Sequence, residues 1–109
     1  MTALSLPEPI AAYFAAGQQN AQALVQCFTA QAVVKDERRI HEGREAIAAW
    51  KAQASAQYSY TVDPFEFHVE DGHPVVRCHV AGNFPGSPVD LRYHFQLERS
   101  LIASLEITA

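Results

Sequence analysis

The first half of the chain carries apolar residues at the spacing of an α-helix, interrupted by one strand-like run. Three stretches have this spacing: residues 6–20, 20–28 and 44–57. Because an apolar stripe that recurs about every 3.6 residues marks one face of a helix, we expect three helices. Asn20 is the expected N-cap of the second helix, since its side chain can accept a hydrogen bond from a free N–H group of the first turn. The strand-like run covers residues 32–37, and a loop is expected over 38–43.

The second half of the chain alternates apolar and polar residues, which is the period of a half-buried strand. The alternating segments are residues 60–70, 74–84, 89–98 and 101–107. They are separated by the turn-forming or polar breaks DGH, PGSP and RS, so we expect an antiparallel meander. One face of this sheet is apolar and must be covered. The predicted fold class is therefore α+β, with three N-terminal helices packed on a curved antiparallel sheet.

The alternation also predicts which residues lie opposite one another in the meander. An apolar residue is best stabilised by an apolar partner across the strands. The pairs that satisfy this are Phe84 with Val89, Val80 with Tyr93, Cys78 with Phe95, Val76 with Leu97, Val69 with Val76, Phe67 with Cys78, Leu97 with Leu101 and Phe95 with Ala103. This register leaves Ile102 on the outer face, among polar residues.

Length and composition narrow the class of protein. The chain has 109 residues, which suits a single domain over residues 1–109, and 49% of them are apolar, as in globular chains. Its net charge of -4 provides no positive field for phosphates, so we expect no nucleic-acid partner. No apolar run approaches the roughly 20 residues of a membrane span, and residues 1–10 lack the features of a signal peptide. We therefore expect a soluble cytoplasmic protein with no membrane partner, in which Cys27 and Cys78 stay unpaired.

The order of these elements resembles that of a known group of proteins. Four parts carry the resemblance: YFAAGQQNAQALVQCF, AVVKD, HEGREAIAAW and the meander that follows. They cover nearly the whole chain and are similar to the SnoaL-like branch of the nuclear transport factor 2-like superfamily. The resemblance implies a cystatin-like cone, in which helices and sheet enclose an internal pocket, and commonly a homodimer. It implies less about the reaction, because the superfamily includes ketosteroid isomerases, polyketide cyclases, dehydratases, epoxide hydrolases and non-catalytic binding modules.

Ketosteroid isomerase is the mechanistic template that this resemblance offers. In that enzyme a carboxylate moves a proton beside a carbonyl group, while a tyrosine and a second acid hold the enolate oxygen. Carried over by position, Asp36 at the end of AVVKD matches the base and Tyr13 matches the tyrosine. Tyr93 stands where the template has its second acid, so two phenols would have to donate to the oxygen. The alternative is that both tyrosines are ordinary core residues with hydroxyls at the rim.

Asp36 also has two interpretations. Alternation places Ala32, Val34 and Asp36 on one face of the strand, which directs the carboxylate toward the opening of the cone. However, Arg38 and Arg39 follow closely, and an adjacent guanidinium would lower the carboxylate pKa and weaken it as a base. A solvated strand end is therefore the alternative to a catalytic base.

Further residues are expected to line the pocket: Phe14, Trp50, His41, Phe67 and Phe95. Trp50 is bulky and lies on a helix stripe, so it is a pocket wall or an ordinary core residue. His41 lies in the expected loop before the third helix, either near the pocket mouth or simply exposed. No glycine-rich phosphate loop, nucleophile elbow, Cys-x-x-Cys pair or His-Glu-x-x-His motif occurs in the sequence. We therefore expect a small apolar, carbonyl-bearing ligand and proton transfer without a cofactor.

The outer face of the predicted sheet is polar. Its expected rows hold Glu66, His79, His94 and Ser104, with Arg92 opposite Glu106. Two histidines and a glutamate on neighbouring strands could bind zinc, but charged pairs on a solvent face give the same pattern. We favour charged pairs, expect no metal, and expect a homodimer through this outer face.

Two hypotheses for the function follow. The first is a small-molecule-pocket protein that acts as an isomerase, cyclase or hydrolase. The second is a non-catalytic binding or dimerisation module with the same fold. Polar groups that converge inside the cone would favour the first, and an interior filled by side chains would favour the second.

Overall fold

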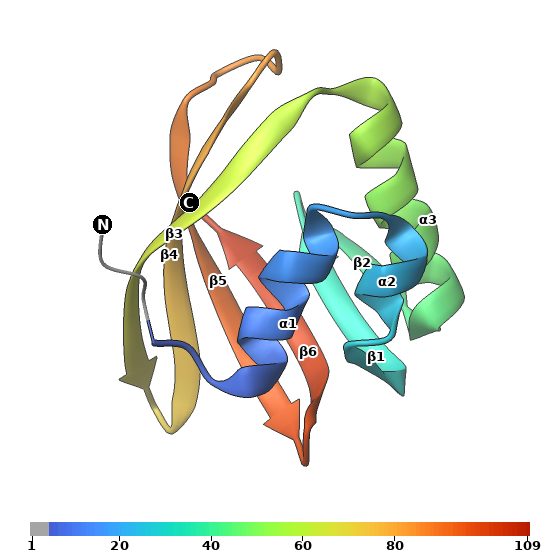
Figure 1. The fold of residues 1–109 in the computed structure, drawn as a ribbon, viewed down its shortest axis with the longest axis vertical. Coiled ribbons are helices and arrows are strands. Elements are labelled where there is room, and N and C mark those ends of the chain that lie inside the picture. Colours follow the sequence, from blue (N-terminus) through green and yellow to red (C-terminus); the bar gives the residue numbers. More distant parts are fainter. Residues whose placement is uncertain (1–4) are drawn as a thin grey trace.

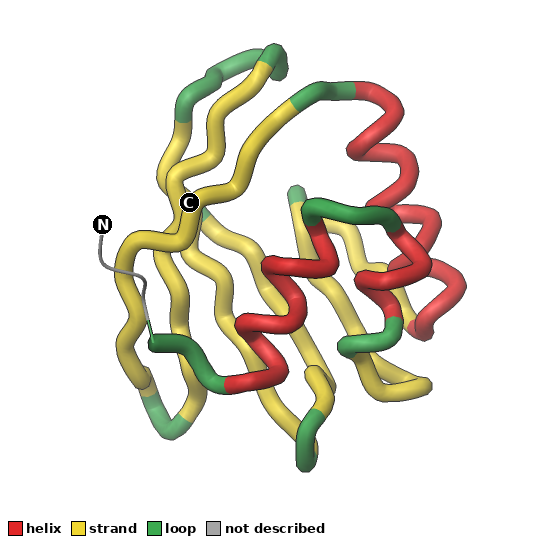
Figure 2. Tube along the Cα trace, viewed as in Figure 1, coloured by secondary structure: helices red, strands yellow, loops and turns green. Residues whose placement is uncertain are grey.

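Helices and sheet form two layers in the computed structural model, which describes residues 5–109 (Figure 1). The elements are α1 (Glu8–Gly17), α2 (Ala21–Val25), β1 (Phe28–Asp36), β2 (Arg39–Glu42), α3 (Gly43–Gln57), β3 (Tyr60–Glu70), β4 (His73–Gly82), β5 (Val89–Glu98) and β6 (Leu101–Thr108). The strands form one sheet in the order β2-β1-β6-β5-β4-β3, with the helices on one of its faces (Figures 1 and 2). The predicted α+β class is confirmed. Within residues 5–109, no helix is long and apolar enough to cross a membrane.

β1 lies beside β6 and runs parallel to it, so the sheet is mixed rather than antiparallel throughout. The meander from β3 to β6 is antiparallel at every step, as predicted. The prediction of a wholly antiparallel sheet is wrong at β1, because β2, α3 and the first three strands of the meander separate β1 from β6 in the sequence. Alternation within a strand shows its buried face but not a distant partner. The parallel pairing brings the ends of β1 and β6 to the same end of the sheet, with Val34 opposite Leu105.

Residues 39–42 form a strand where a loop was expected. β2 pairs antiparallel with β1, and Asp36 lies opposite Arg39. Glu37 and Arg38 make the turn between them, with φ angles of 52° and 67°. Two consecutive residues in the left-handed region form the turn that matches the twist of a hairpin. Such turns usually carry Asn-Gly or Asp-Gly, so Glu-Arg is no recognisable signal for one.

The β4–β5 pair is shifted relative to the prediction, yet the same residues face inward. Val89 lies opposite Val80 instead of Phe84. The ladder starts late because the loop between the strands has hydrogen bonds of its own, including one from the Gly82 N–H to Ser87 Oγ at 2.9 Å (Figure 2 shows the loop at the top). A shift by an even number of residues leaves the alternation unchanged, so the predicted inner face of the meander is kept here.

Irregularities in two other pairs change the remaining registers. The β3–β4 pairing shifts between Pro64 and Glu66. In the β5–β6 pair, Leu97 lies opposite Ile102 instead of Leu101. This shift turns Ile102 inward and leaves it fully buried, so its predicted place on the outer face is wrong. Other predicted pairs also move: Phe67 lies opposite Val76, and Phe95 lies opposite Leu105.

The junction of α2, β1 and α3 is fixed by hydrogen bonds. The predicted cap of α2 is confirmed, because the Ala23 N–H donates to Asn20 Oδ1 at 2.8 Å. The helix ends at Val25, and Phe28, which was expected within it, opens β1. Arg44 at the start of α3 donates through Nε and Nη2 to the Phe28 carbonyl oxygen at 3.0 and 2.7 Å. Such charge-assisted bonds are strong, so they tie α3 to β1.

The core lies between the helices and the inner face of the sheet. Its largest fully buried side chains are Ile10, Leu24, Phe28, Val34, Ile47, Val76, Cys78, Phe95, Ile102 and Leu105. Cys27 and Cys78 are both free, and Cys78 is buried, as predicted. Close packing of these residues from both layers holds the ends of β1, β3 and α3 in fixed positions.

Candidate functional site

Asp36 ends β1 on the inner face of the sheet, where its side chain is partly buried. Ala32 and Val34 precede it on that face and are fully buried, as the alternation predicted. Trp50 Nε1 donates a hydrogen bond to Asp36 Oδ2 at 3.1 Å. Burial raises the pKa of Asp36, and the Trp50 hydrogen bond and the charge of His41 offset this rise only in part. The carboxylate is thus held in place, and its pKa lies nearer to neutrality than that of an exposed aspartate.

His41 and Trp50 lie close together because β2 leads directly into α3. Their ring centroids are 5.9 Å apart. His41 was expected in a loop, but it is a half-buried residue of β2, opposite Val34. Positive charge on His41 stabilises the Asp36 carboxylate, so the imidazole belongs to the same local electrostatic environment.

Arg38 and Arg39 do not lower the pKa of Asp36, contrary to what their place in the sequence suggested. Both side chains are exposed at the β1–β2 turn, whereas Asp36 faces the core. Within residues 5–109, the ion pairs involve Glu66, His68, Glu70, Arg77, His79 and Asp90. Burial is therefore the main cause of the raised Asp36 pKa, and the adjacent negative charge of Glu37 adds to it.

Tyr13 on α1 and Tyr93 on β5 meet in the core, with ring centroids 6.4 Å apart. Each side chain is 6% exposed. Burial raises the pKa of both phenols, and negative charge on Asp36 adds to the rise. Both are therefore neutral near neutral pH, and each O–H group can donate a hydrogen bond.

Phe14 and Phe95 form an aromatic cluster with these tyrosines. Tyr13 meets the two phenylalanine rings edge-on, with centroid distances of 5.1 and 5.6 Å. Phe95 is fully buried, while Phe14 and Phe67 pack partly buried against the same core. The predicted catalytic tyrosines and the phenylalanines Phe14 and Phe95 are thus brought together, but their rings pack against one another.

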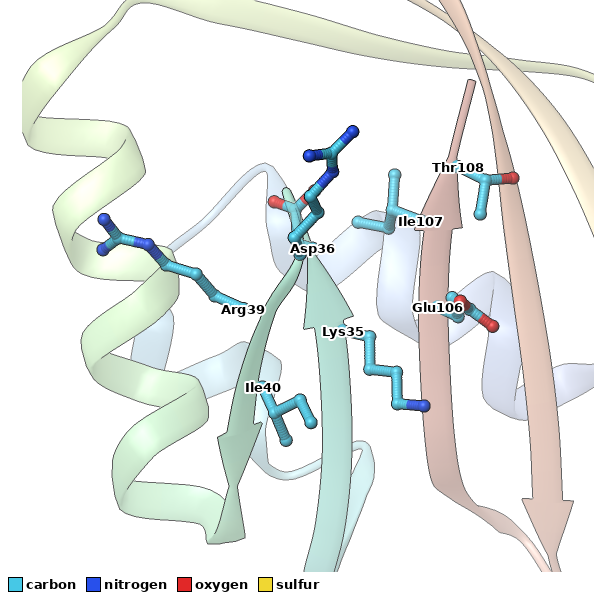
Figure 3. Close-up of a pocket in the computed structure, with 8 residues that line it drawn as sticks. Lys35, Asp36, Arg39, Ile40, Glu106, Ile107 and Thr108 are labelled. Carbon is cyan, nitrogen blue, oxygen red and sulfur yellow. The ribbon is translucent and has the colours of Figure 1, made fainter.

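A pocket of about 350 Å³ lies at the end of the sheet where β1, β2 and β6 meet (Figure 3). Its lining consists of Lys35, Asp36, Arg38, Arg39, Ile40, Glu106, Ile107 and Thr108. Figure 3 shows Asp36 at the tip of β1, with Ile107 of β6 beside it. Asp36 is the one residue of the predicted site that lines this pocket, because the predicted aromatic residues pack in or against the core. The lining is largely charged, whereas an apolar pocket was expected.

Similarity to solved structures decides the family. The chain is 40% identical to a candidate polyketide cyclase from Sinorhizobium meliloti, over 94% of this chain and 95% of that chain, with a TM-score of 0.89. It belongs to the SnoaL-like branch of the nuclear transport factor 2-like superfamily. The resemblance found in the sequence is thereby confirmed. The chain matches no protein-family model and no curated protein.

Two more distant structures share the fold of this SnoaL-like chain. One is a protein from Catenulispora acidiphila with a ketosteroid isomerase-like fold, in complex with trimethylamine; it is 23% identical over 96% of this chain and 87% of that chain, with a TM-score of 0.84. The other is a cystatin-fold protein from Novosphingobium aromaticivorans, 21% identical over 98% of this chain and all 100% of that chain, with a TM-score of 0.80. At these identities the likeness concerns the fold alone.

The sequence did not point to two further polar residues of this SnoaL-like chain, Lys51 and Tyr60. Lys51 Nζ donates to the Tyr60 hydroxyl at 3.2 Å. Tyr60 is the first residue of β3 and packs against the core. The only signal was the position of Lys51 directly after Trp50 on a helix, and a single sequence does not show which strand end that lysine reaches.

The outer face of the sheet is built from polar pairs, although not the predicted ones. Glu66 pairs with Arg77 at 2.9 Å, and His79 Nδ1 lies 2.8 Å from Asp90 Oδ1. The predicted rows are wrong in register, since Arg92 lies opposite Thr108 and His94 lies opposite Glu106. In the part of the chain that the structure describes, no group of three or more histidine, cysteine, aspartate or glutamate residues could hold a metal ion.

Proposed function

We propose that this SnoaL-like protein is a cofactor-independent proton-transfer enzyme, an isomerase or cyclase that acts on an apolar, carbonyl-bearing ligand. The observation that carries the proposal is the Asp36 carboxylate, which is partly buried, held by Trp50 Nε1 at 3.1 Å, and raised in pKa by burial. A base works best when its pKa is close to the working pH, so burial improves an aspartate for this task. Asp36 also lines the pocket where β1, β2 and β6 meet, through which a ligand could reach it.

The proposed reaction uses Asp36 and the two buried phenols. Asp36 removes a proton from the carbon next to the ligand carbonyl, and the carbonyl oxygen takes up the negative charge as an enolate. Tyr13 and Tyr93 donate hydrogen bonds to that oxygen, which is the role of an oxyanion hole. In an isomerase, Asp36 returns the proton to another carbon. In a cyclase, the enolate carbon attacks a second carbonyl group, whose oxygen then receives the proton from Asp36.

The ligand site in this proposal is the interior of a cone formed by the helices and the curved sheet. Trp50, Phe14 and Phe67 are partly buried at the margin of the core, where they can provide apolar walls. The ring centroid of His41 lies 5.9 Å from that of Trp50, the residue that donates to Asp36. Phe95 is fully buried and supports the walls from behind.

A second candidate function is a non-catalytic binding or dimerisation module. The observation that favours it is the aromatic cluster, because Tyr13, Phe14, Tyr93 and Phe95 pack ring against ring and occupy interior space. A ligand of steroid size would require these rings to move. A binding module needs only part of that space.

Hydrogen–deuterium exchange at the carbon next to a ketone separates the two candidates. Steroid and aromatic ketones are incubated with the protein in deuterated buffer, and NMR follows the loss of the proton. We expect exchange with the wild-type protein and about a hundredfold slower exchange with Asp36→Asn. Asp90→Asn is the control, because Asp90 is an exposed aspartate on the outer face. Ligand-induced thermal shifts without any exchange would favour the binding module, and full exchange by Asp36→Asn would contradict the proposed base.

We also propose a homodimer formed through the outer face of the sheet. Ile102 was the expected apolar contact, but it is buried in the core. We propose Phe65 as the apolar contact in place of Ile102. Phe65 is 44% exposed, and the Cζ atom of Arg77 lies 5.1 Å from the centroid of its ring. Sedimentation velocity at micromolar concentration should show a dimer for the wild-type protein and a monomer for Phe65→Asp. A monomeric wild-type protein would contradict the proposal.

A cytoplasmic location also remains a proposal. The two free thiols, Cys27 and Cys78, support it, because isolated thiols persist in a reducing compartment.

A further inference from the structure

Lys51 and Tyr60 form a pair between α3 and the start of β3. Lys51 Nζ lies 3.2 Å from the Tyr60 hydroxyl oxygen and 5.1 Å from the centroid of its ring. Both side chains are half-buried. The ion pairs within residues 5–109 do not include Lys51, so this ammonium group has no carboxylate partner there. A partly buried cation without a counter-ion attracts an anion more strongly than an exposed one.

Gly82 places Tyr60 on the inner face of the sheet. The two residues lie opposite each other in the β3–β4 ladder. A Cβ atom at position 82 would come within 2.6 Å of the Tyr60 Cβ and would also collide with the Ser59 carbonyl oxygen. Only glycine allows so close an approach, so the position of Tyr60 is built into the backbone.

The pair lies next to the Trp50–Asp36 contact along α3. Trp50 and Lys51 are consecutive on α3, and Trp50 reaches Asp36 at the end of β1 while Lys51 reaches Tyr60 at the start of β3. Trp50 and Tyr60 both pack against the core that contains Tyr93. Two consecutive residues of α3 therefore contact a carboxylate at the end of β1 and a phenol at the start of β3.

We propose that Lys51 and Tyr60 form the subsite that binds a second, negatively charged oxygen of the ligand, distinct from the carbonyl oxygen that Tyr13 and Tyr93 hold: the phenolate of an aromatic ring or an enolate oxygen of a 1,3-dicarbonyl compound. This inference rests on the proposed function, because it takes the interior beside Asp36 as the ligand site. Lys51 donates to the Tyr60 oxygen, so the Tyr60 hydroxyl hydrogen is free to point at the ligand. The Asp36 carboxylate repels the same oxygen, so the ligand binds with its oxygen toward Lys51 and its carbon atoms toward Asp36.

Titration of two coloured or ultraviolet-absorbing probes tests the subsite. The probes are 4-nitrophenol, a phenol, and dimedone, a 1,3-dicarbonyl compound, and the absorbance of each anion reports its ionisation when bound. We expect the wild-type protein to bind the anion of at least one probe about tenfold more tightly than the neutral form, and so to lower its apparent pKa. Lys51→Met should remove this preference, and Lys51→Arg should keep it because the charge is retained. Tyr60→Phe should weaken it.

Two control variants match these changes. Arg99→Asn removes one positive charge at the β5–β6 turn, where the φ of 59° is one that asparagine tolerates. The turn lies at the opposite end of the sheet from the β1–β2 turn (Figure 1). Tyr58→Phe removes a hydroxyl that receives its hydrogen bond from Gln57, whereas Lys51 donates to Tyr60. Both controls should keep the preference for the anion.

The outcomes separate this inference from the proposed function. Asp36→Asn should abolish proton exchange but keep, or strengthen, the preference for the anion. Loss of exchange without loss of the preference would therefore support the subsite, and a preference in a protein that exchanges no protons would support the subsite while contradicting the enzyme. The inference is overturned if the wild-type protein binds neither anion preferentially, if Lys51→Met behaves like wild type, or if Arg99→Asn loses as much as Lys51→Met.

Discussion

Trp50 Nε1 donates a hydrogen bond to Asp36 Oδ2 at 3.1 Å, which connects α3 to the last residue of β1. The bond fixes one of the two carboxylate oxygens. It stabilises the ionised form, while burial destabilises it, and burial prevails. The same tryptophan thus orients the proposed base and limits the rise of its pKa.

Replacement of Trp50 by phenylalanine should raise the pKa of Asp36 further. The variant keeps an aromatic ring but removes the indole donor that stabilises the carboxylate. Loss of a hydrogen bond to a charged group should also lower the free energy of unfolding by about 2 kcal/mol. NMR titration of the Asp36 side-chain carbon measures the pKa, and urea unfolding measures the stability. An unchanged pKa would show that the bond does not form in solution.

The pH dependence of stability should reveal the buried carboxylate. The pKa of Asp36 in the folded chain lies above its ordinary value of 3.8, so the folded chain binds the proton more tightly than the unfolded chain. The stability that this contributes is complete below 3.8 and is lost as pH rises through the raised pKa. Asp36→Asn does not ionise, so it has no such loss. The free energy of unfolding of this variant should therefore increase relative to that of wild type as pH rises through this window. Urea unfolding at a series of pH values measures the difference.

Glu70→Gln should give the opposite sign and so serves as the matched comparison. A hydrogen bond from His68 is the main cause that holds the pKa of Glu70 below its ordinary value of 4.5. The stability from this group is present above 4.5 and is lost as pH falls through the lowered pKa. The free energy of unfolding of wild type should therefore fall relative to that of Glu70→Gln on acidification. Equal slopes for the two variants would contradict the assignment of Asp36 as buried.

Local periodicity was sufficient to predict most of the elements and the inner face of the meander. The alternation of Ala32, Val34 and Asp36 correctly placed the carboxylate on the buried face. Periodicity was insufficient where a turn or bulge depends on backbone geometry. The Glu37–Arg38 turn, with two left-handed residues of types that rarely form it, concealed β2.

The site was only partly predictable for a related reason. Resemblance to the family brought Asp36, Tyr13 and Tyr93 into consideration, and the structure brings the two tyrosines within 6.4 Å of each other. The resemblance did not indicate the Lys51–Tyr60 pair, because this pair depends on how α3 lies over the start of β3. The resemblance also did not indicate that burial raises the pKa of Asp36, because the exposure of Arg38 and Arg39 follows from the unpredicted hairpin.

The two buried tyrosines should be more important for turnover than for stability. Within residues 5–109 neither hydroxyl takes part in a side-chain hydrogen bond, so Tyr13→Phe and Tyr93→Phe should change the free energy of unfolding by less than about 1 kcal/mol. If they form the oxyanion hole, each change should slow proton exchange by about a hundredfold. Tyr58→Phe is the control for both measurements. Slow exchange combined with a large loss of stability would indicate a structural role instead.

Gly82→Ala should displace Tyr60 and destabilise the β3–β4 ladder. The new Cβ would lie 2.6 Å from the Tyr60 Cβ and would collide with the backbone of Ser59, which cannot rotate away as a side chain could. Forced overpacking of this kind costs about 1–3 kcal/mol of unfolding free energy. Gly17→Ala is the control, because a Cβ there meets only Leu24 Cδ1 at an ordinary 3.7 Å, and replacing a glycine whose backbone suits alanine stabilises a protein by about 0.4–1 kcal/mol. Urea unfolding of the two variants should therefore give shifts of opposite sign. A neutral Gly82→Ala would mean that the strands separate easily at this point, and the backbone would then not fix Tyr60 beside Lys51.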